Sequence, residues 1–345
     1  MVFSDSASAV SSSATKSHDG QVLVSVVIVS FNTRETTLHC LRDLEGELER
    51  LSGESEVFVV DNDSKDGSAE AIRREFPSVR LLELDSNEGF GPANNRAFAE
   101  ARGEFLLLLN SDAFVHPGAL ETLVGFLQAP ENARVGGVGP KLLNEDGSLQ
   151  ASCWKFPSPG RSWIEALGLA RIFASHPKLG DYYRWAHDET RGVDFVIGAC
   201  LLMRREVYEE VGGFDPAFFL YAEETDWQKR MLMHGWTIAF CPDAVVTHLG
   251  GVSGAADSNK TSTLFWQGQE RFMQKHFGSR GWLLFRGALF VGALTRFLAL
   301  ATLALHPRKR QSSRTRLRFF AWQMGRLLST RAPAPLRETR SDANN

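Results

Sequence analysis

The sequence predicts an α/β fold in which a mixed, mostly parallel sheet is flanked by helices. Residues 22–30 form a nearly unbroken run of β-branched residues, which is typical of a central strand in a parallel sheet. Short apolar runs then alternate with helical patterns along the first third of the chain, and this alternation indicates a doubly wound sheet. The third observation is the run of four leucines at residues 106–109, which predicts a buried strand.

The expected elements follow in a regular order up to residue 135. After the first strand come helices at about residues 35–51, 68–76 and 92–101, and strands at residues 57–60, 80–84 and 105–109. From residue 136, glycine, proline and aromatic residues break the alternation up to about residue 193. Apolar runs at residues 195–203 and 237–240, with a helix near residues 225–234, then indicate α+β material folded against the same sheet.

The last part of the chain has a different composition. Residues 282–305 are apolar over a length that can span a bilayer, but Arg286 and Arg296 interrupt them, roughly 80° apart around a helix. This favours an amphipathic helix lying on a membrane, and the basic residues that follow at 308–318 favour anionic lipid headgroups. From residue 280 onward there are 13 Lys/Arg against 2 Asp/Glu, whereas the preceding residues carry 25 against 39. A transmembrane span, or contact with a partner or nucleic acid, is the alternative for this segment.

Composition argues against several classes of protein. With 43% hydrophobic and 23% charged residues, the chain is typical of a soluble globular protein. Its four cysteines are scattered without a CxxC pair, which argues against a zinc site or a disulfide framework and favours a reducing compartment. Residues 1–20 are rich in serine and lack a basic start followed by an apolar core, so a disordered lead-in is expected rather than a signal peptide. No complete GxGxxG follows the first strand, which argues against a dinucleotide-dependent oxidoreductase.

Two acidic residues lie where strands are expected to end, at the edge of the sheet where open α/β folds bind ligands. Asp112 closely follows the leucine run, and its carboxylate can hold a divalent cation against a diphosphate; the alternative is an Asx-turn. Asp61 follows the second strand, where it can accept the imide N–H of a uracil or thymine; the alternative is a cap for the next helix. Together they indicate a ligand-binding site at this edge of the sheet.

Three of these segments, residues 24–32, 59–64 and 108–112, resemble the nucleotide-binding half of family-2 glycosyltransferases, and residues 87–95 resemble the insert of their rhamnosyltransferase-like branch. The resemblance covers about residues 22–277. It implies a GT-A fold and an inverting transfer from a nucleotide-diphosphate sugar. It also implies donor contacts from strand ends and from the glycine turn at residues 89–91, although that turn can equally be structural. The donor-binding residues so predicted are Ser30, Asn32, Asp61, Asn62, Asn87, Gly89, Phe90, Asn94, Asn95, Asn110 and Ser111.

The metal site implied by the resemblance is built on Asp112. The family usually shows Asp-x-Asp at this point, whereas this chain has Asn110 in the first position, which adds no charge. In the family a histidine at a later strand end often completes the site, and His248 corresponds to it; without that context, a core or surface histidine is the alternative. Oxygen and imidazole ligands of this kind suit Mn²⁺ or Mg²⁺.

The catalytic and acceptor residues come from the second half. In the acidic segment at residues 221–227, Glu224 takes the position of the family's base aspartate, with Asp226 as the second candidate. Glu223 is expected to orient a neighbour on the acceptor side; the alternative for the whole segment is an acidic helix N-terminus. The segment Gly198, Ala199 and Cys200 resembles the floor beneath the acceptor, and Cys200 has no basic partner that would make it a nucleophile.

The sequence thus predicts an inverting, metal-dependent glycosyltransferase, with dTDP-rhamnose as the favoured donor and a saccharide or lipid-linked saccharide of a cell-surface polymer as acceptor. A catalytically inactive sugar-nucleotide-binding scaffold and a sugar nucleotidyltransferase are the alternatives. We expect a cytoplasmic protein, peripheral at the inner face of the cell membrane, without nucleic acid; the oligomeric state is not predicted. The expected boundaries are a disordered lead-in at 1–21, a nucleotide-sugar half at 22–135, an acceptor half at 136–278, a membrane-associating tail at 279–330 and a disordered end at 331–345.

Overall fold

The computed structural model describes residues 21–173, 176, 180, 185–250, 258–304 and 310–328. The disordered segments predicted at both ends lie outside these residues except for Gln21, and so do Arg308 and Lys309 of the basic cluster.

The first half alternates strands and helices as predicted. Its elements are β1 (Val22–Ser30), α1 (Arg34–Leu48), β2 (Glu54–Asp61), α2 (Ser68–Glu75), β3 (Arg80–Glu83), α3 (Phe90–Phe98) and β4 (Phe105–Asn110). The four strands are parallel and lie in the order β3-β2-β1-β4. Because the strands run in one direction, their carboxyl ends share one edge, which brings together the loops after β1, β2 and β4.

The second half extends the same sheet. After β4 come β5 (Ala113–Val115), α4 (Ala119–Gln128), η1 (Pro130–Asn132), β6 (Val135–Leu143), β7 (Leu149–Gln150), β8 (Cys153–Trp154), α5 (Pro159–Ala166), α6 (Leu169–Ile172), β9 (Arg191–Val193), β10 (Phe195–Val196), β11 (Cys200–Arg204), α7 (Arg205–Val211), α8 (Glu223–Met233) and β12 (Thr237–His248). The strand order continues β4-β11-β6-β12-β5, with β11 antiparallel to both its neighbours. The sheet is therefore mixed and mostly parallel, as predicted.

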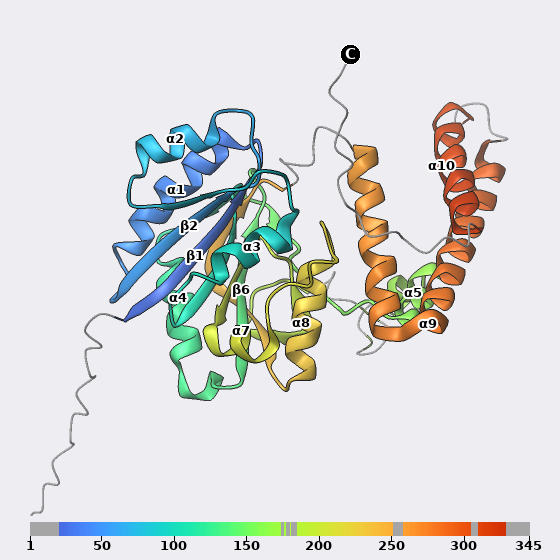
Figure 1. The fold of residues 1–345 in the computed structure, drawn as a ribbon. Coiled ribbons are helices and arrows are strands. Elements are labelled where there is room, and N and C mark those ends of the chain that lie inside the picture. Colours follow the sequence, from blue (N-terminus) through green and yellow to red (C-terminus); the bar gives the residue numbers. More distant parts are fainter. Residues whose placement is uncertain are drawn as a thin grey trace, which may run out of the picture.

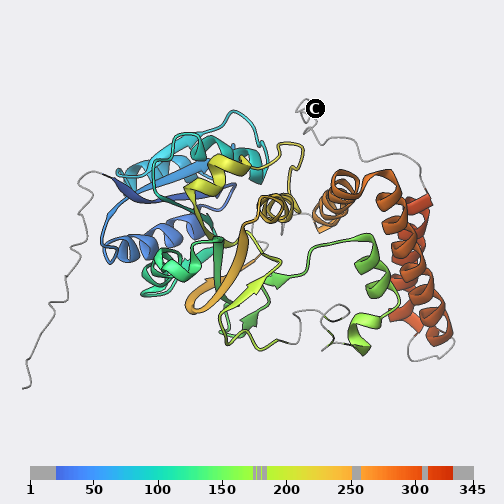
Figure 2. The same ribbon diagram turned by 90° about the horizontal axis from the view of Figure 1, so that it is seen from below.

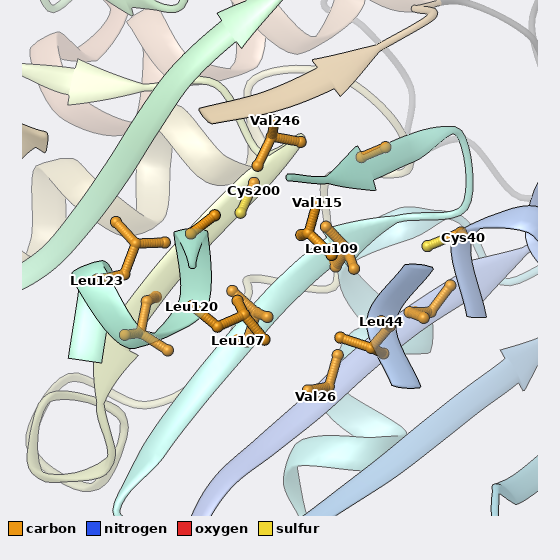
Figure 3. Close-up of a cluster of buried hydrophobic side chains, with 14 of the residues drawn as sticks. Val26, Cys40, Leu44, Leu107, Leu109, Val115, Leu120, Leu123, Cys200 and Val246 are labelled. Atoms are coloured by element: carbon orange, nitrogen blue, oxygen red, sulfur yellow. The ribbon is translucent and has the colours of Figure 1, made fainter. Parts of the chain in front are cut away.

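Each face of the sheet is covered by helices (Figures 1 and 2). One apolar cluster joins β1 and β4 to α1, α2 and α4, and Figure 3 shows part of it around Leu44, Leu107 and Leu123. A second cluster joins the opposite side chains of the strands to α3, α7 and α8. Both faces of the central strands are thus buried, which is why their sequences are continuously apolar rather than alternating.

The C-terminal helices α9 (Ser258–Ala304) and α10 (Arg310–Leu328), together with α5 from the middle of the chain, form a helical lobe. Figure 1 shows α9 as two arms, and the bend lies at Gly278, whose backbone is non-helical with φ 63° and ψ −172°. The first arm packs against the start of α8, and the second packs against α5 and α10. Residues Thr263–Thr302 are long and apolar enough to cross a membrane, by length and composition alone.

Arg286 has a different environment from the one its sequence position suggests. It does not lie on a solvent-facing polar face of α9, because its side chain is buried and pairs with Glu270 at 3.0 Å. It also donates to the carbonyls of Arg326 and Leu327 near the end of α10. The arginine that interrupts the apolar run therefore joins the two arms of α9 to α10.

Candidate active site

The site begins at the carboxyl end of β4. Leu106 to Leu109 are almost completely buried, so the first polar residue after them, Asn110, lies at the edge of the core. The chain then turns through Ser111 and Asp112 into β5. The hydroxyl groups of Ser111 and Thr33 form a hydrogen bond of 3.1 Å, which connects this turn to the end of β1.

Strand pairing brings the end of β12 to the same place. β12 pairs antiparallel with β5, so that His248 lies opposite Ala113, the neighbour of Asp112. The backbone N–H of Leu249 donates to the Asp112 carbonyl at 3.1 Å. As a result, His248 Nε2 lies 3.3 Å from Asp112 Oδ1, although 136 residues separate them in the sequence.

The orientation of the His248 ring is fixed by Gln150 of β7. The Gln150 amide nitrogen donates to Asn144 Oδ1 and to the His248 carbonyl, at 2.9 and 3.0 Å. Its Oε1 therefore accepts from His248 Nδ1 at 2.7 Å. In the neutral ring the proton is then on Nδ1, which leaves an unprotonated Nε2 facing the Asp112 carboxylate. Gln150 was not predicted from the sequence, where a single glutamine in a two-residue strand carries no motif.

These groups fit a divalent cation. Two acceptors, Asp112 Oδ1 and His248 Nε2, face each other, and the buried Asn110 Oδ1 beside them has no hydrogen-bond partner among the described residues. Carboxylate, amide and imidazole ligands suit Mn²⁺ or Mg²⁺, which usually take further oxygens from a substrate diphosphate. Within the described ranges no group of three or more His, Cys, Asp or Glu side chains could hold a metal ion. A cation here would therefore depend on the ligand for part of its coordination.

A second acidic pair begins helix α8. Tyr221 and Ala222, immediately before it, both have left-handed backbones, with φ of 69° and 68°. Left-handed conformations of residues other than glycine are strained and persist only where the surroundings enforce them. Here α9 does so: Gly268 lies so close to the Tyr221 carbonyl that a Cβ would overlap it. This turn directs the start of α8 into the cavity, with Glu223 and Glu224 in its first turn.

Burial sets the protonation of this pair. Desolvation raises the pKa of Glu224, and it raises the pKa of Glu223 further, with the neighbouring carboxylate adding to the effect. Glu223 is buried, and its Oε2 has no hydrogen-bond partner in the described part of the chain. A carboxylate with a raised pKa is a stronger base, as proton abstraction from a hydroxyl group requires.

Asp226 lies on the other side of α8. It is fully buried and pairs with Arg230 of the same helix and with Lys275 and His276 of α9, at 2.8–3.0 Å. Burial alone would raise the pKa of Asp226, but the hydrogen bonds from His276 and Lys275 and the nearby Arg230 charge hold it below its usual value of 3.8. Asp226 does not line the cavity. These ion pairs join α8 to α9, so the geometry indicates a structural role for Asp226 and does not support the predicted catalytic one.

Asp61 occupies the end of β2. Its Oδ2 accepts from the Ser64 backbone N–H at 3.0 Å, while its buried Oδ1 has no partner among the residues that the structure describes. Desolvation raises the pKa of this carboxyl group, and the bonds from Ser64 only partly offset it. One oxygen thus serves the turn, and the other is left for a donor such as a base N–H.

Asn62 supports the predicted donor loop. Its amide nitrogen donates to Asn87 Oδ1 and to the Gly89 carbonyl, at 3.0 and 3.1 Å, and its Oδ1 accepts from the Glu88 N–H at 2.9 Å. Gly89 has φ 91°, and the next N–H, that of Phe90, donates to the Phe219 carbonyl at 2.9 Å. Asn62, Asn87, Gly89 and Phe90 all line the cavity.

Several predicted donor residues, Asp61 among them, lie outside the cavity lining. Ser30 is buried in a hydroxyl cluster with Thr33 and Thr37. Asn32 is exposed and accepts from the Lys65 N–H at 2.7 Å. The side chain of Asn94 donates to the Phe90 carbonyl, and that of Asn95 bonds both backbone groups of Phe214. These contacts hold the surrounding loops in place.

The predicted acceptor segment divides in the same way. Gly198 and Ala199 line the cavity, and Gly198 is a direct neighbour of the predicted base, since a Cβ there would lie in ordinary contact with Glu224 Cβ at 3.5 Å. Cys200 is buried in the apolar cluster beneath the sheet, and burial raises the pKa of its thiol to about 12. A thiol of that pKa is no nucleophile.

All the cavity-lining groups meet in one space of about 1520 Å³. Its inner end is lined by Asn110, Asp112, His248, Glu223 and Glu224. Its outer end is lined by α5, α9 and α10 of the helical lobe. A cavity of this size, with two candidate cation ligands and two adjacent carboxyl groups at one end, fits an enzyme that transfers a group from a nucleotide sugar.

The comparisons agree with that class. The family model of the glycosyltransferase-like family 2 matches residues 21–272, and the chain belongs to this family. A relative from Mycobacterium tuberculosis, N-acetylglucosaminyl-diphospho-decaprenol L-rhamnosyltransferase, is 32% identical over 204 residues, which are 56% of this chain and 66% of that protein. The O-antigen biosynthesis protein RfbC of Myxococcus xanthus is 31% identical over 67% of this chain but only 18% of its own length. The chain thus spans slightly less than two thirds of the first relative and a small part of the second.

A solved structure supports the fold. The mannosyltransferase PcManGT from Pyrobaculum calidifontis, in complex with GDP-Man and Mn²⁺, matches with a TM-score of 0.52 and 19% identity, over 88% of this chain and 86% of that one. The predictions of a family-2 glycosyltransferase and of a GT-A-like fold are confirmed.

Proposed function

We propose that the chain is an inverting, metal-dependent glycosyltransferase that transfers rhamnose from dTDP-rhamnose to a lipid-linked saccharide in cell-surface polymer assembly. The observation that carries the proposal is that the Asp112–His248 pair and the Glu223–Glu224 pair line one cavity. The first pair suits a cation and a diphosphate, and the second suits removal of a proton. The rhamnosyltransferase relative supports the choice of sugar.

In the proposed mechanism, Asp61 Oδ1 accepts the imide N–H of thymine, and the turn at Asn62 and Gly89 encloses the nucleotide. Asp112 and His248 would hold a Mn²⁺ or Mg²⁺ ion, which would offset negative charge on the diphosphate leaving group. Glu224 accepts the proton of the acceptor hydroxyl while the hydroxyl oxygen bonds to C1 of the sugar. The attack comes from the face opposite the diphosphate, whose bond to C1 breaks, so the configuration at C1 is inverted. Glu223 keeps its proton and orients the neighbouring Glu224.

Membrane association is part of the proposal. The helical lobe exposes large apolar side chains, among them Leu283, Leu284, Leu298 and Trp322. Arg316 and Arg318 of α10 are exposed in the same lobe. Exposed apolar groups beside basic ones favour an anionic membrane surface, which for a cytoplasmic enzyme is the inner face of the cell membrane.

The test is isothermal titration of dTDP and UDP, with and without Mn²⁺, against wild type and Asp112→Ala. We expect Mn²⁺-dependent binding, tighter for dTDP, that is lost in the variant. Asp188→Ala, an exposed carboxylate outside the cavity lining, is the matched control and should bind as wild type does. If neither nucleotide binds to wild type, the donor assignment is wrong.

The nucleotidyltransferase alternative has less support. Such an enzyme needs a glycine-rich, basic loop for a triphosphate after the first strand, and residues 31–34 carry one arginine and no glycine. An inactive scaffold would bind the donor as an enzyme does, so only a measurement of turnover distinguishes the two. The variant for that measurement is Glu224→Gln.

A further inference from the structure

The outer end of the cavity has a wall that the transfer reaction itself does not need. Three helices of the helical lobe form it, and the side chains that face the cavity are mostly apolar or small. They include Ala166 of α5, Phe285, Ala288 and Ala293 of α9, and Phe319 and Phe320 of α10. We call these residues the apolar wall.

We propose that the apolar wall binds the hydrocarbon chain of an amphiphilic acceptor whose polar head reaches Glu224. This rests on the proposed function, and it assigns the acceptor's chain to a defined surface. The first argument is continuity: the wall and the acidic pair border the same cavity. A purely polar saccharide would leave the wall facing water, whereas an amphiphile matches both ends, and each buried methylene raises affinity roughly fourfold.

Small residues of α9 border the cavity. Ala288, Gly292 and Ala293 all contribute to its lining from the second arm, and Gly292 lies against Ala166 of α5. Ala288 and Ala293 are buried within the lobe, yet both border the cavity. Larger side chains at these positions would displace the packed atoms around them at the border of the cavity and so disturb the apolar wall.

The wall is also held firmly. Arg286, one turn away from Leu289, fixes the second arm to Glu270 of the first arm and to the end of α10. Trp282 also donates to Glu270, at 3.2 Å. Preformed walls lose less entropy on binding than walls that must be ordered by the ligand.

Charge on the wall indicates the kind of amphiphile. Arg171 and Arg296 border the cavity, and neither has an ion-pair partner in the part of the chain that the structure describes. Among the described residues, Arg296 makes one hydrogen bond, to the Gly292 carbonyl one turn back on α9. By contrast, Arg161 pairs with Glu165. Two cations without carboxylate partners beside an apolar wall complement a chain that ends in phosphate or diphosphate.

The bilayer itself is a different occupant, and it would use a different surface. Leu284 and Leu298 are more than half exposed and do not border the cavity. They lie on the same arm of α9 as Ala293. The arm therefore has one face toward the cavity and another toward the outside. A substitution on each face distinguishes binding of a chain in the cavity from contact with the bilayer.

The experiment is isothermal titration in detergent-free buffer with farnesyl diphosphate and, as the short-chain reference, isopentenyl diphosphate. We expect wild type to bind farnesyl diphosphate at least tenfold more tightly. Ala293→Trp should weaken farnesyl diphosphate binding at least tenfold and leave Mn²⁺-dependent dTDP binding unchanged. Leu298→Trp, on the outer face, should bind both probes as wild type does. Ala288→Phe, a smaller change in the same wall, serves if Ala293→Trp does not fold.

Equal affinity of wild type for the two probes would overturn the proposal, and so would unchanged farnesyl diphosphate binding in both wall variants. Equal weakening by Ala293→Trp and Leu298→Trp would overturn it in favour of non-specific adsorption to the outer face. Failure of dTDP to bind would count against the proposed function alone, because the farnesyl diphosphate titration contains no nucleotide.

Discussion

The two ends of the cavity are built on different physical principles. At the inner end, each polar group is placed by hydrogen bonds and strand register: Gln150 orients His248, and the pairing of β5 with β12 sets its distance from Asp112. At the outer end, helices present apolar side chains whose positions depend on packing, among them the small Ala288 and Ala293. Directional interactions tolerate little change, whereas packed surfaces accept volume changes that preserve the fold. The inner end should therefore determine whether transfer occurs, and the outer end which acceptor is used.

The largest expected effect is at the inner end. Glu224→Gln keeps the size of the side chain and removes the proton acceptor, so we expect turnover to fall by about 10³-fold. Donor binding should be unchanged, because the proposed nucleotide contacts come from Asp61 and Asp112. The measurement is the rate of sugar transfer at saturating donor, with dTDP affinity determined on the same preparation.

Glu209→Gln, an exposed residue on α7, is the matched control and should transfer at the wild-type rate. If Glu224→Gln is as active as wild type, Glu224 is not the base. If wild type itself binds donor and never turns over, the inactive scaffold is the better description.

A substitution at Asp226 tests whether α8 has a reactive side facing the cavity and a structural side facing α9. Asp226→Asn removes the charge that Arg230, Lys275 and His276 share, and we expect the free energy of unfolding to fall by about 3 kcal/mol. Because the folded-state pKa of Asp226 is lowered, its contribution is present above the unfolded pKa near 3.8 and is lost as pH falls through the lower folded value.

Urea denaturation at pH 7 measures this loss, and the transfer rate per folded molecule should stay within about threefold of wild type. A collapse of the rate with unchanged stability would restore Asp226 as a catalytic candidate.

The sequence predicted the fold well because the local signals agreed with the tertiary ones. The run at residues 22–30 and the four leucines are apolar on both faces, which only a sheet covered on both sides explains. Arg286 could not be predicted in the same way. Its partner Glu270 and the carbonyls of α10 lie far away in the sequence, so a helical wheel assigned it to a polar face that the structure buries.

The site shows the same limit. Sequence patterns placed Asp112 and His248 at strand ends, but their separation depends on the register of β12 against β5, which no local pattern encodes. Asn94 and Asn95 follow a glycine turn as a phosphate-binding motif would, yet their amides hold the backbone of Phe90 and Phe214. Amide side chains satisfy backbone groups as readily as they bind ligands, so residue type alone does not separate the two roles.

Gln150 offers a smaller test of the inner end. Gln150→Leu removes the acceptor for His248 Nδ1 and frees the ring to change its tautomer, so we expect Mn²⁺ affinity to fall roughly 10- to 100-fold. The measurement is the Mn²⁺ concentration that gives half-maximal dTDP binding. Gln150→Glu keeps an acceptor for Nδ1–H and should recover most of the affinity. Equal loss in both variants would show that Gln150 acts through the strand β7 rather than through the imidazole.

The smallest expected effect concerns the acidic pair itself. The two adjacent carboxyl groups titrate together, and desolvation raises the pKa of both above the usual 4.5, more strongly for the buried Glu223. Glu224 must be ionised to accept a proton, so kcat should fall as pH decreases through its raised pKa. At that pH Glu223 still holds its proton, and a glutamine at this position resembles the protonated acid.

Glu223→Gln should therefore shift the acidic limb of the kcat profile by less than about half a pH unit. Glu224→Asp, which keeps a carboxylate one methylene shorter, should keep an acidic limb at a lower rate. A shift of more than one unit toward low pH in Glu223→Gln would mean that Glu223 carries the charge when Glu224 titrates. In that case Glu224, the partly exposed carboxylate beside Gly198, would be the one that retains the proton, and Glu223 would be the base.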